Sequence, residues 1–107
     1  MFNGDRYITR GIQAAIGIDI QMAMWMMIDE LKNKNNFNLD YLQVFTINKV
    51  NSKGSTIVSI KHEQEVEPYL KEITIPTEYP IDRKVFVISS HYEDGKEYST
   101  MMLSDEY

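Results

Sequence analysis

Residues 18–32, IDIQMAMWMMIDELK, are the one long stretch whose apolar residues recur with a helical period. At 100° per residue, one side of this helix collects Ile20, Met24, Met27 and Leu31, with Ala23 and Ile28 flanking them. Asp19 near the start suits the positive end of the helix dipole, and the asparagine-rich residues 33–36 offer a stop. The stretch therefore predicts one amphipathic helix with a core-facing side.

Outside this helix the apolar pattern changes to a period of two, which is typical of β-strands. A first strand is predicted over residues 5–10, and further strands over residues 40–50, 56–65, 69–75, 84–90 and 97–103. Residues 51–55 and Glu93-Asp94-Gly95 are turn signals. The pattern predicts a single α+β domain over residues 1–107. We expect a two-layer sandwich, with the one main helix packed on a largely antiparallel sheet of about five to six strands.

Composition narrows the functional classes. The chain has 107 residues, no cysteine and a net charge of −5. A negative protein does not attract a phosphate backbone by its overall field, so direct nucleic-acid binding is not expected. No run approaches the ~20 apolar residues of a membrane span, and the N-terminus lacks the pattern of a signal peptide. We therefore expect a cytoplasmic protein without membrane association.

Reactive groups are few. A metal or acid–base site of His62, Glu63 and Glu65 is disfavoured, because a period of two sends His62 to the face opposite both glutamates. A catalytic zinc ion needs three converging ligands, so we expect His62 to be a partly exposed strand residue. The sequence SSH at residues 89–91 lacks the turn that exposes a hydrolase nucleophile. The expectation is a protein that is not an enzyme, with no catalytic residue, metal or cofactor.

The side of the helix opposite the core stripe is unusually apolar. It carries Ile18, Met22, Trp25 and Met26, where a helix that covers one sheet face should be polar. Methionine is common on adaptable binding surfaces and tryptophan is a frequent interface anchor. Either both sides of the helix are buried within this small domain, or the second side meets another chain. In the latter case these four residues form a partner-binding surface.

Two charged clusters are further candidates. Glu63, Glu65 and Glu67 are expected to line one strand face, either as a solvated surface or as an acidic strip that meets a basic partner. Arg6, Tyr7 and Arg10 near the N-terminus form an alternative ligand-binding cluster. The two arginines should share one side of the predicted first strand, where they would grip a phosphate or make a structural salt bridge.

Five short segments together resemble one known family. They are Arg6-Tyr7-x-Thr9-Arg10-Gly11, Gln21-x-x-x-Trp25-x-x-Ile28-Asp29, residues 39–45 (LDYLQVF), His62-x-Gln64-Glu65-x-x-x-Tyr69 and residues 98–103 (YSTMML). The chain resembles small uncharacterised proteins of low-GC Gram-positive bacteria, their phages and mobile elements, which carry a domain-of-unknown-function label. The resemblance implies a dispensable accessory role, such as counteracting a bacterial defence system. It supplies no catalytic residues.

Three hypotheses follow for the function. The first is a phage or mobile-element accessory protein that acts by non-covalent protein binding, with an anti-CRISPR inhibitor of a Cas9-type defence nuclease as its narrower form. The second is a binder, or sponge, for a small molecule such as a signalling nucleotide. The third is a structural homo-oligomer in which the apolar helix side packs on its twofold mate.

Overall fold

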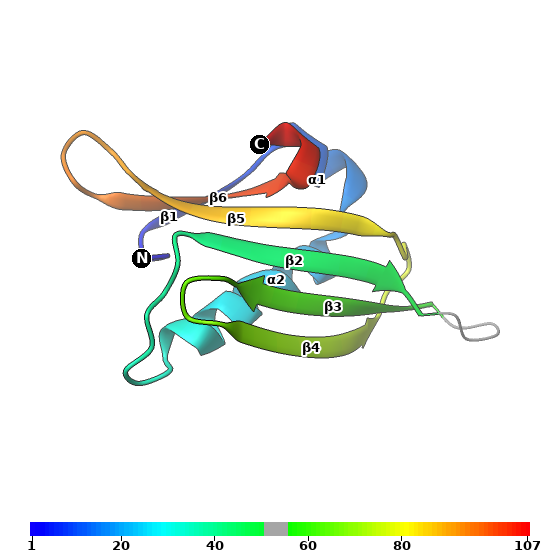
Figure 1. Ribbon diagram of the computed structural model, residues 1–107. Helices are drawn as coiled ribbons and strands as arrows, with labels where there is room; N and C mark the ends of the chain where they lie inside the picture. Colours follow the sequence, from blue (N-terminus) through cyan, green and yellow to red (C-terminus); the bar gives the residue numbers. More distant parts are fainter. Residues whose placement is uncertain (51–55) are drawn as a thin grey trace.

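The computed structural model describes residues 1–50 and 56–107, so the turn predicted at residues 51–55 lies outside the described residues (Figure 1). The elements are β1 (Asp5–Ile8), α1 (Arg10–Ala15), α2 (Ile18–Lys32), β2 (Leu42–Lys49), β3 (Ile57–Gln64), β4 (Tyr69–Pro76), β5 (Arg83–His91), β6 (Glu97–Leu103) and the short 3-10 helix η1 (Ser104–Glu106). The strands form a mixed sheet of order β1-β6-β5-β2-β3-β4. β1 pairs with β6 in parallel, whereas the other four pairings are antiparallel.

The α+β class is confirmed, and α2 spans the residues that the sequence predicted. The predicted first strand over residues 5–10 is wrong at its end, because β1 stops at Ile8 and a second helix begins at Arg10. Thr9 causes the change of structure, since its hydroxyl oxygen accepts a hydrogen bond from the Ile12 amide at 3.2 Å and caps α1. The prediction of one main helix therefore becomes two helices beside six strands.

The core lies on the side of the sheet that faces α2. In β2 the buried residues are Gln43, Phe45 and Ile47, and the residues between them are half-buried. Phe45 and Ile47 join Ile20, Met24 and Met27 of α2 in one apolar cluster. Figure 1 shows α2 running behind the sheet on this side. The other face, turned away from α2, is called the far face below.

Among residues 1–50 and 56–107, no helix has both the length and the apolar content that a membrane crossing requires.

Candidate functional site

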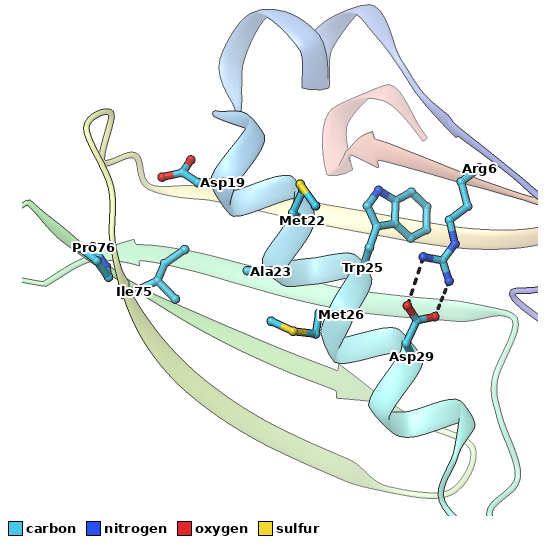
Figure 2. A pocket seen from close by; sticks show the side chains of 9 residues that line it. All are labelled: Arg6, Asp19, Met22, Ala23, Trp25, Met26, Asp29, Ile75 and Pro76. Carbon is cyan, nitrogen blue, oxygen red and sulfur yellow. Dashed lines mark hydrogen bonds and ion pairs between the residues drawn. The ribbon is translucent and has the colours of Figure 1, made fainter.

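An open hollow of about 580 Å³ lies along the exposed side of α2. We call it the α2 hollow (Figure 2). It is lined by Arg6, Asp19, Met22, Ala23, Trp25, Met26, Asp29, Ile75 and Pro76. The lining therefore combines one side of α2 with one residue of β1 and the end of β4.

The helix period explains why methionines line the hollow. Ile20, Met24 and Met27 are buried in the core, which leaves the opposite side of α2 facing outward. Met22 and Met26, one helical turn apart, are 64% and 56% exposed. Large apolar side chains that are exposed together in this way are a feature of docking surfaces.

Of the four helix residues that the sequence predicted as a partner surface, the structure brings three together. Met22, Trp25 and Met26 line the α2 hollow. Ile18 is exposed but lies apart, at the start of α2 beside Tyr79. Sequence reasoning missed Ile75, because its place in the wall depends on which strand of the sheet lies next to α2.

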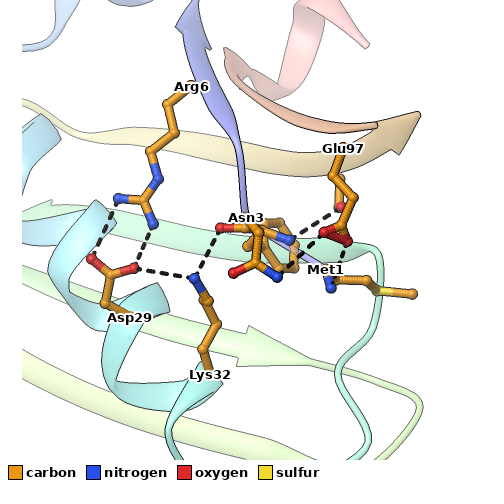
Figure 3. Close-up of polar contacts among 8 residues, drawn as sticks. Met1, Asn3, Arg6, Asp29, Lys32 and Glu97 are labelled. Carbon is orange, nitrogen blue, oxygen red and sulfur yellow. Dashed lines mark hydrogen bonds and ion pairs between the residues drawn. The ribbon is translucent and has the colours of Figure 1, made fainter. Parts of the chain in front are cut away.

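A charged pair forms one wall of the hollow. The Arg6 guanidinium donates two hydrogen bonds to the Asp29 carboxylate, one of them at 3.3 Å from Nη1 to Oδ2. The guanidinium carbon also lies 4.7 Å from the Trp25 ring centroid, within cation–π range. Figure 3 shows the contacts continuing from Asp29 to Lys32, whose Nζ donates to the Phe2 carbonyl at 3.2 Å. These contacts fasten the N-terminal segment to α2 and hold the half-buried Trp25 in place.

The alternative ligand cluster is not assembled. Alternation along β1 sends Tyr7 to the side opposite Arg6, where its hydroxyl lies 2.5 Å from that of Tyr92. Tyr92 also donates to Asp5, and these hydrogen bonds raise the pKa of Tyr92. Arg10 is an exposed residue of α1, so the prediction that it shares a strand face with Arg6 is wrong. The nucleotide-sponge hypothesis thereby loses the converging cations on which it depended.

The three glutamates do not line one strand face, so that prediction is also wrong. β3 ends before Glu65, which leaves Glu65 and Glu67 in the turn that leads to β4. Glu67 accepts a hydrogen bond from the Asn38 amide at 2.7 Å. Glu63 projects from the far face, with its carboxylate 3.7 Å from the Lys61 ammonium. The predicted partner residues therefore do not share one surface, and Glu63 faces away from the α2 hollow.

His62 is fully buried, so the prediction of a partly exposed histidine is wrong. Its ring stacks on Phe45 with centroids 4.4 Å apart, and its Nε2 lies 2.6 Å from the Gln43 side-chain oxygen. The Gln43 amide donates in turn to Gln64 at 2.8 Å. Glu63 does project to the other face, as the alternation predicted. Among the described residues no three His, Asp or Glu side chains gather as a metal site would require.

Two segments of the family resemblance meet in this buried cluster. Gln43 and Phe45 belong to residues 39–45, and His62 and Gln64 belong to the segment that ends at Tyr69. The Gln64 amide donates to the Asn38 and Glu67 carbonyls, both at 2.8 Å. The cluster therefore ties the segment after α2 to the turn between β3 and β4, which is a structural role.

Fold and site together define a small α+β domain whose most conspicuous surface is an apolar hollow beside a helix. The chain belongs to the family described as "Staphylococcal protein of unknown function (DUF960)", whose model matches residues 5–106. It is similar in fold to the crystal structure of a protein of unknown function from Enterococcus faecalis, with a TM-score of 0.69 and 21% identity. That similarity covers 100% of this chain and 98% of the other. No curated protein matches. The resemblance to a low-GC Gram-positive family is confirmed.

The contact between Arg6 and Trp25 gives a direct prediction. Trp25 is the sole tryptophan, so removing the guanidinium with Arg6→Gln should expose the indole to water and shift its fluorescence to longer wavelength. The free energy of unfolding should fall by less than about 1 kcal/mol, because Asp29 is 48% exposed and solvent screens the pair. Arg10→Gln, the matched control, should leave the emission unchanged. An unshifted spectrum for Arg6→Gln would show that the arginine does not cover the indole.

The buried His62 predicts a pH dependence of stability. Burial, and then the positive charge of Lys71, lower its pKa from 6.5 to about 4. The unfolded chain therefore binds a proton at a pH where the folded chain does not, so stability is full above pH 6.5 and falls as the pH drops toward 4. Urea unfolding should give about 2 kcal/mol less stability at pH 5 than at pH 7.

Two variants test whether His62 causes this change of stability with pH. His62→Gln should flatten the change between pH 7 and pH 5, whatever its own cost in stability. His91→Gln alters the exposed histidine at the end of β5 and should retain the slope. An unchanged slope in His62→Gln would mean that other groups cause the acid sensitivity.

Proposed function

We propose that this chain is a non-enzymatic accessory protein that binds a protein partner non-covalently through the α2 hollow. The observation that carries the proposal is the gathering of Met22, Met26 and Trp25 with Ile75 in one open hollow. In this proposal the domain is a two-layer sandwich that works in the cytoplasm. The partner supplies the cover that the outer side of α2 lacks.

The make-up of the hollow supports a protein partner. Protein interfaces combine an apolar centre with a polar rim, and burying apolar surface stabilises a complex by roughly 25 cal/mol per Å². Met22 and Met26 supply the adaptable centre, while Asp19, Arg6 and Asp29 supply charges around it. Trp25, held by Arg6, is a preordered aromatic anchor.

The narrower proposal is an anti-defence inhibitor carried by a phage or mobile element, with a Cas9-type nuclease as its target. The net charge of −5 supports it, because nucleases that hold nucleic acid present basic channels to an acidic protein. The family resemblance, which implies an origin in phages and mobile elements, also supports it. Glu65 and Glu67 in the exposed turn after β3 are the acidic groups with which such a channel would make contact.

A symmetric homodimer is the second candidate, because the same hollow would serve it. A twofold contact needs a self-complementary surface. The α2 hollow offers apolar Met22 and Met26 beside both members of the Arg6–Asp29 pair. In that case the accessory role would belong to the dimer.

The binding proposal is tested by capture from a Gram-positive lysate with matched variants. Met22→Asp combined with Met26→Asp places charge in the hollow and should lower the yield of each specific partner at least about tenfold, which corresponds to 1.4 kcal/mol. Tyr107→Asp changes a residue that is 70% exposed and packs on Phe86 of β5, outside the hollow, and should keep wild-type capture. Circular dichroism confirms that each variant is folded.

Two results would contradict the proposal. Equal capture by the double variant and the wild type would remove the α2 hollow as the docking site. Loss with Tyr107→Asp alone would move the docking site to the surface beside Phe86. Mass spectrometry of the captured protein then decides the narrower proposal, because a defence nuclease is its required partner.

A further inference from the structure

The outer edge of β4 is open to another strand. β4 is the last strand of the sheet, and among the described residues no strand pairs with its outer side. The Thr77 amide donates to the Thr56 carbonyl at 2.8 Å, and the register continues from the pairing of Pro76 with Ile57. Thr77 and Thr56 are therefore a hydrogen-bonded pair, which fixes the alternation along the whole strand.

That alternation sorts the backbone groups of β4. Every second residue from Tyr69 to Ile75 bonds inward to β3, and the residues between them direct their N–H and C=O groups outward. The outward set is Leu70, Glu72 and Thr74. Pro76 follows in the same phase and has no N–H, so it closes this edge. These three outward-facing residues, each two positions from the next, are enough to pair with a short extended segment.

The α2 hollow adjoins this open edge. Ile75 and Pro76 at the end of β4 line the hollow together with Met22 and Met26, as Figure 2 shows. Further along the strand, the Lys71 ammonium donates a hydrogen bond to Glu30 of α2, and this hydrogen bond raises the pKa of Lys71. A segment added to β4 would therefore have the methionines of α2 along one of its faces.

We propose that the open edge of β4 and the α2 hollow together bind an extended segment of the partner by strand addition. Side chains alternate along such a segment. Those facing α2 meet Ile73, Ile75 and the methionines, so they are apolar. The residue opposite Glu72 projects to the far face and is basic. The ligand class is an alternating apolar and basic peptide, and the inference rests on the proposed function.

Charge supports this choice of segment. Glu72 is exposed, and among the described residues it has no ion pair. Asp19 adds a second carboxylate to the lining of the hollow. An opposite charge placed directly across an antiparallel pair stabilises the pairing, whereas a like charge destabilises it. An acidic chain with a free carboxylate at the centre of its open edge therefore favours a basic segment.

A second copy of the chain fits the edge less well. Antiparallel pairing about a twofold axis sets one residue of β4 against itself. Centred on Glu72, the pairing opposes two carboxylates, and centred on Lys71 it opposes two ammonium groups. Centred on Ile73, it sets Leu70 against Pro76, which lacks the N–H that the outward position needs. Each central register thus carries a cost that a basic segment avoids.

The test uses the full chain and a displayed library of random peptides about as long as β4, which has eight residues. Selected peptides should alternate apolar and basic residues. Their binding should slow hydrogen exchange at the amides of Leu70, Glu72 and Thr74, which no described strand covers in the free protein. Failure to select any peptide above an unrelated control protein, or selection without this protection, would overturn strand addition.

Two variants separate this inference from the proposed function. Thr74→Pro removes an outward N–H, a change that an edge strand tolerates, and should weaken the selected peptides at least about tenfold. Glu72→Lys should reverse the selection from basic to acidic peptides. If the natural partner is lost with Met22→Asp and Met26→Asp but retained with both β4 variants, the hollow binds proteins without strand addition. If all the variants retain it, both proposals fail.

Discussion

The burial of Ile20, Met24 and Met27 between α2 and the sheet determines which side of the helix faces solvent. Fully burying each such side chain is worth roughly 1.5–3 kcal/mol, so the rotation of α2 about its axis is fixed. Once the side with these three residues faces the core, the helix period leaves Met22 and Met26 facing solvent. The apolar surface of this domain therefore follows from its core, because one helix cannot bury both of its sides against one sheet.

The outer side of α2 has different neighbours along its two flanks. Along one flank the Arg6–Asp29 pair connects the helix to β1 and holds Trp25. Along the other flank the helix borders β4, an edge strand whose outward backbone groups have no partner within the described residues. A fixed aromatic, adaptable methionines and an open strand edge lie side by side. Protein partners recognise such surfaces through side chains and backbone together.

Much of the fold could be predicted from the sequence, because the hydrophobic period of a long segment indicates whether it is a helix or a strand. The 15 residues of α2 and the alternation of Phe45 and Ile47 in β2 are examples. The six residues of α1 are too few to establish a period, and its start depends on one cap at Thr9. The site was predicted only in part. Met22, Trp25 and Met26 share a helix side, but the walls formed by Arg6 and Ile75 depend on strand order, which local patterns do not encode.

The proposed binding requires that the outer side of α2 is free in the isolated protein and available to a different molecule. The solution mass, measured by light scattering over a range of concentrations, tests this most directly. A free outer side of α2 predicts the mass of one chain at every concentration, both for the wild type and for Met22→Asp combined with Met26→Asp. A mass of two chains in the wild type that falls to one in the double variant would contradict it, because a second copy would then cover the α2 hollow.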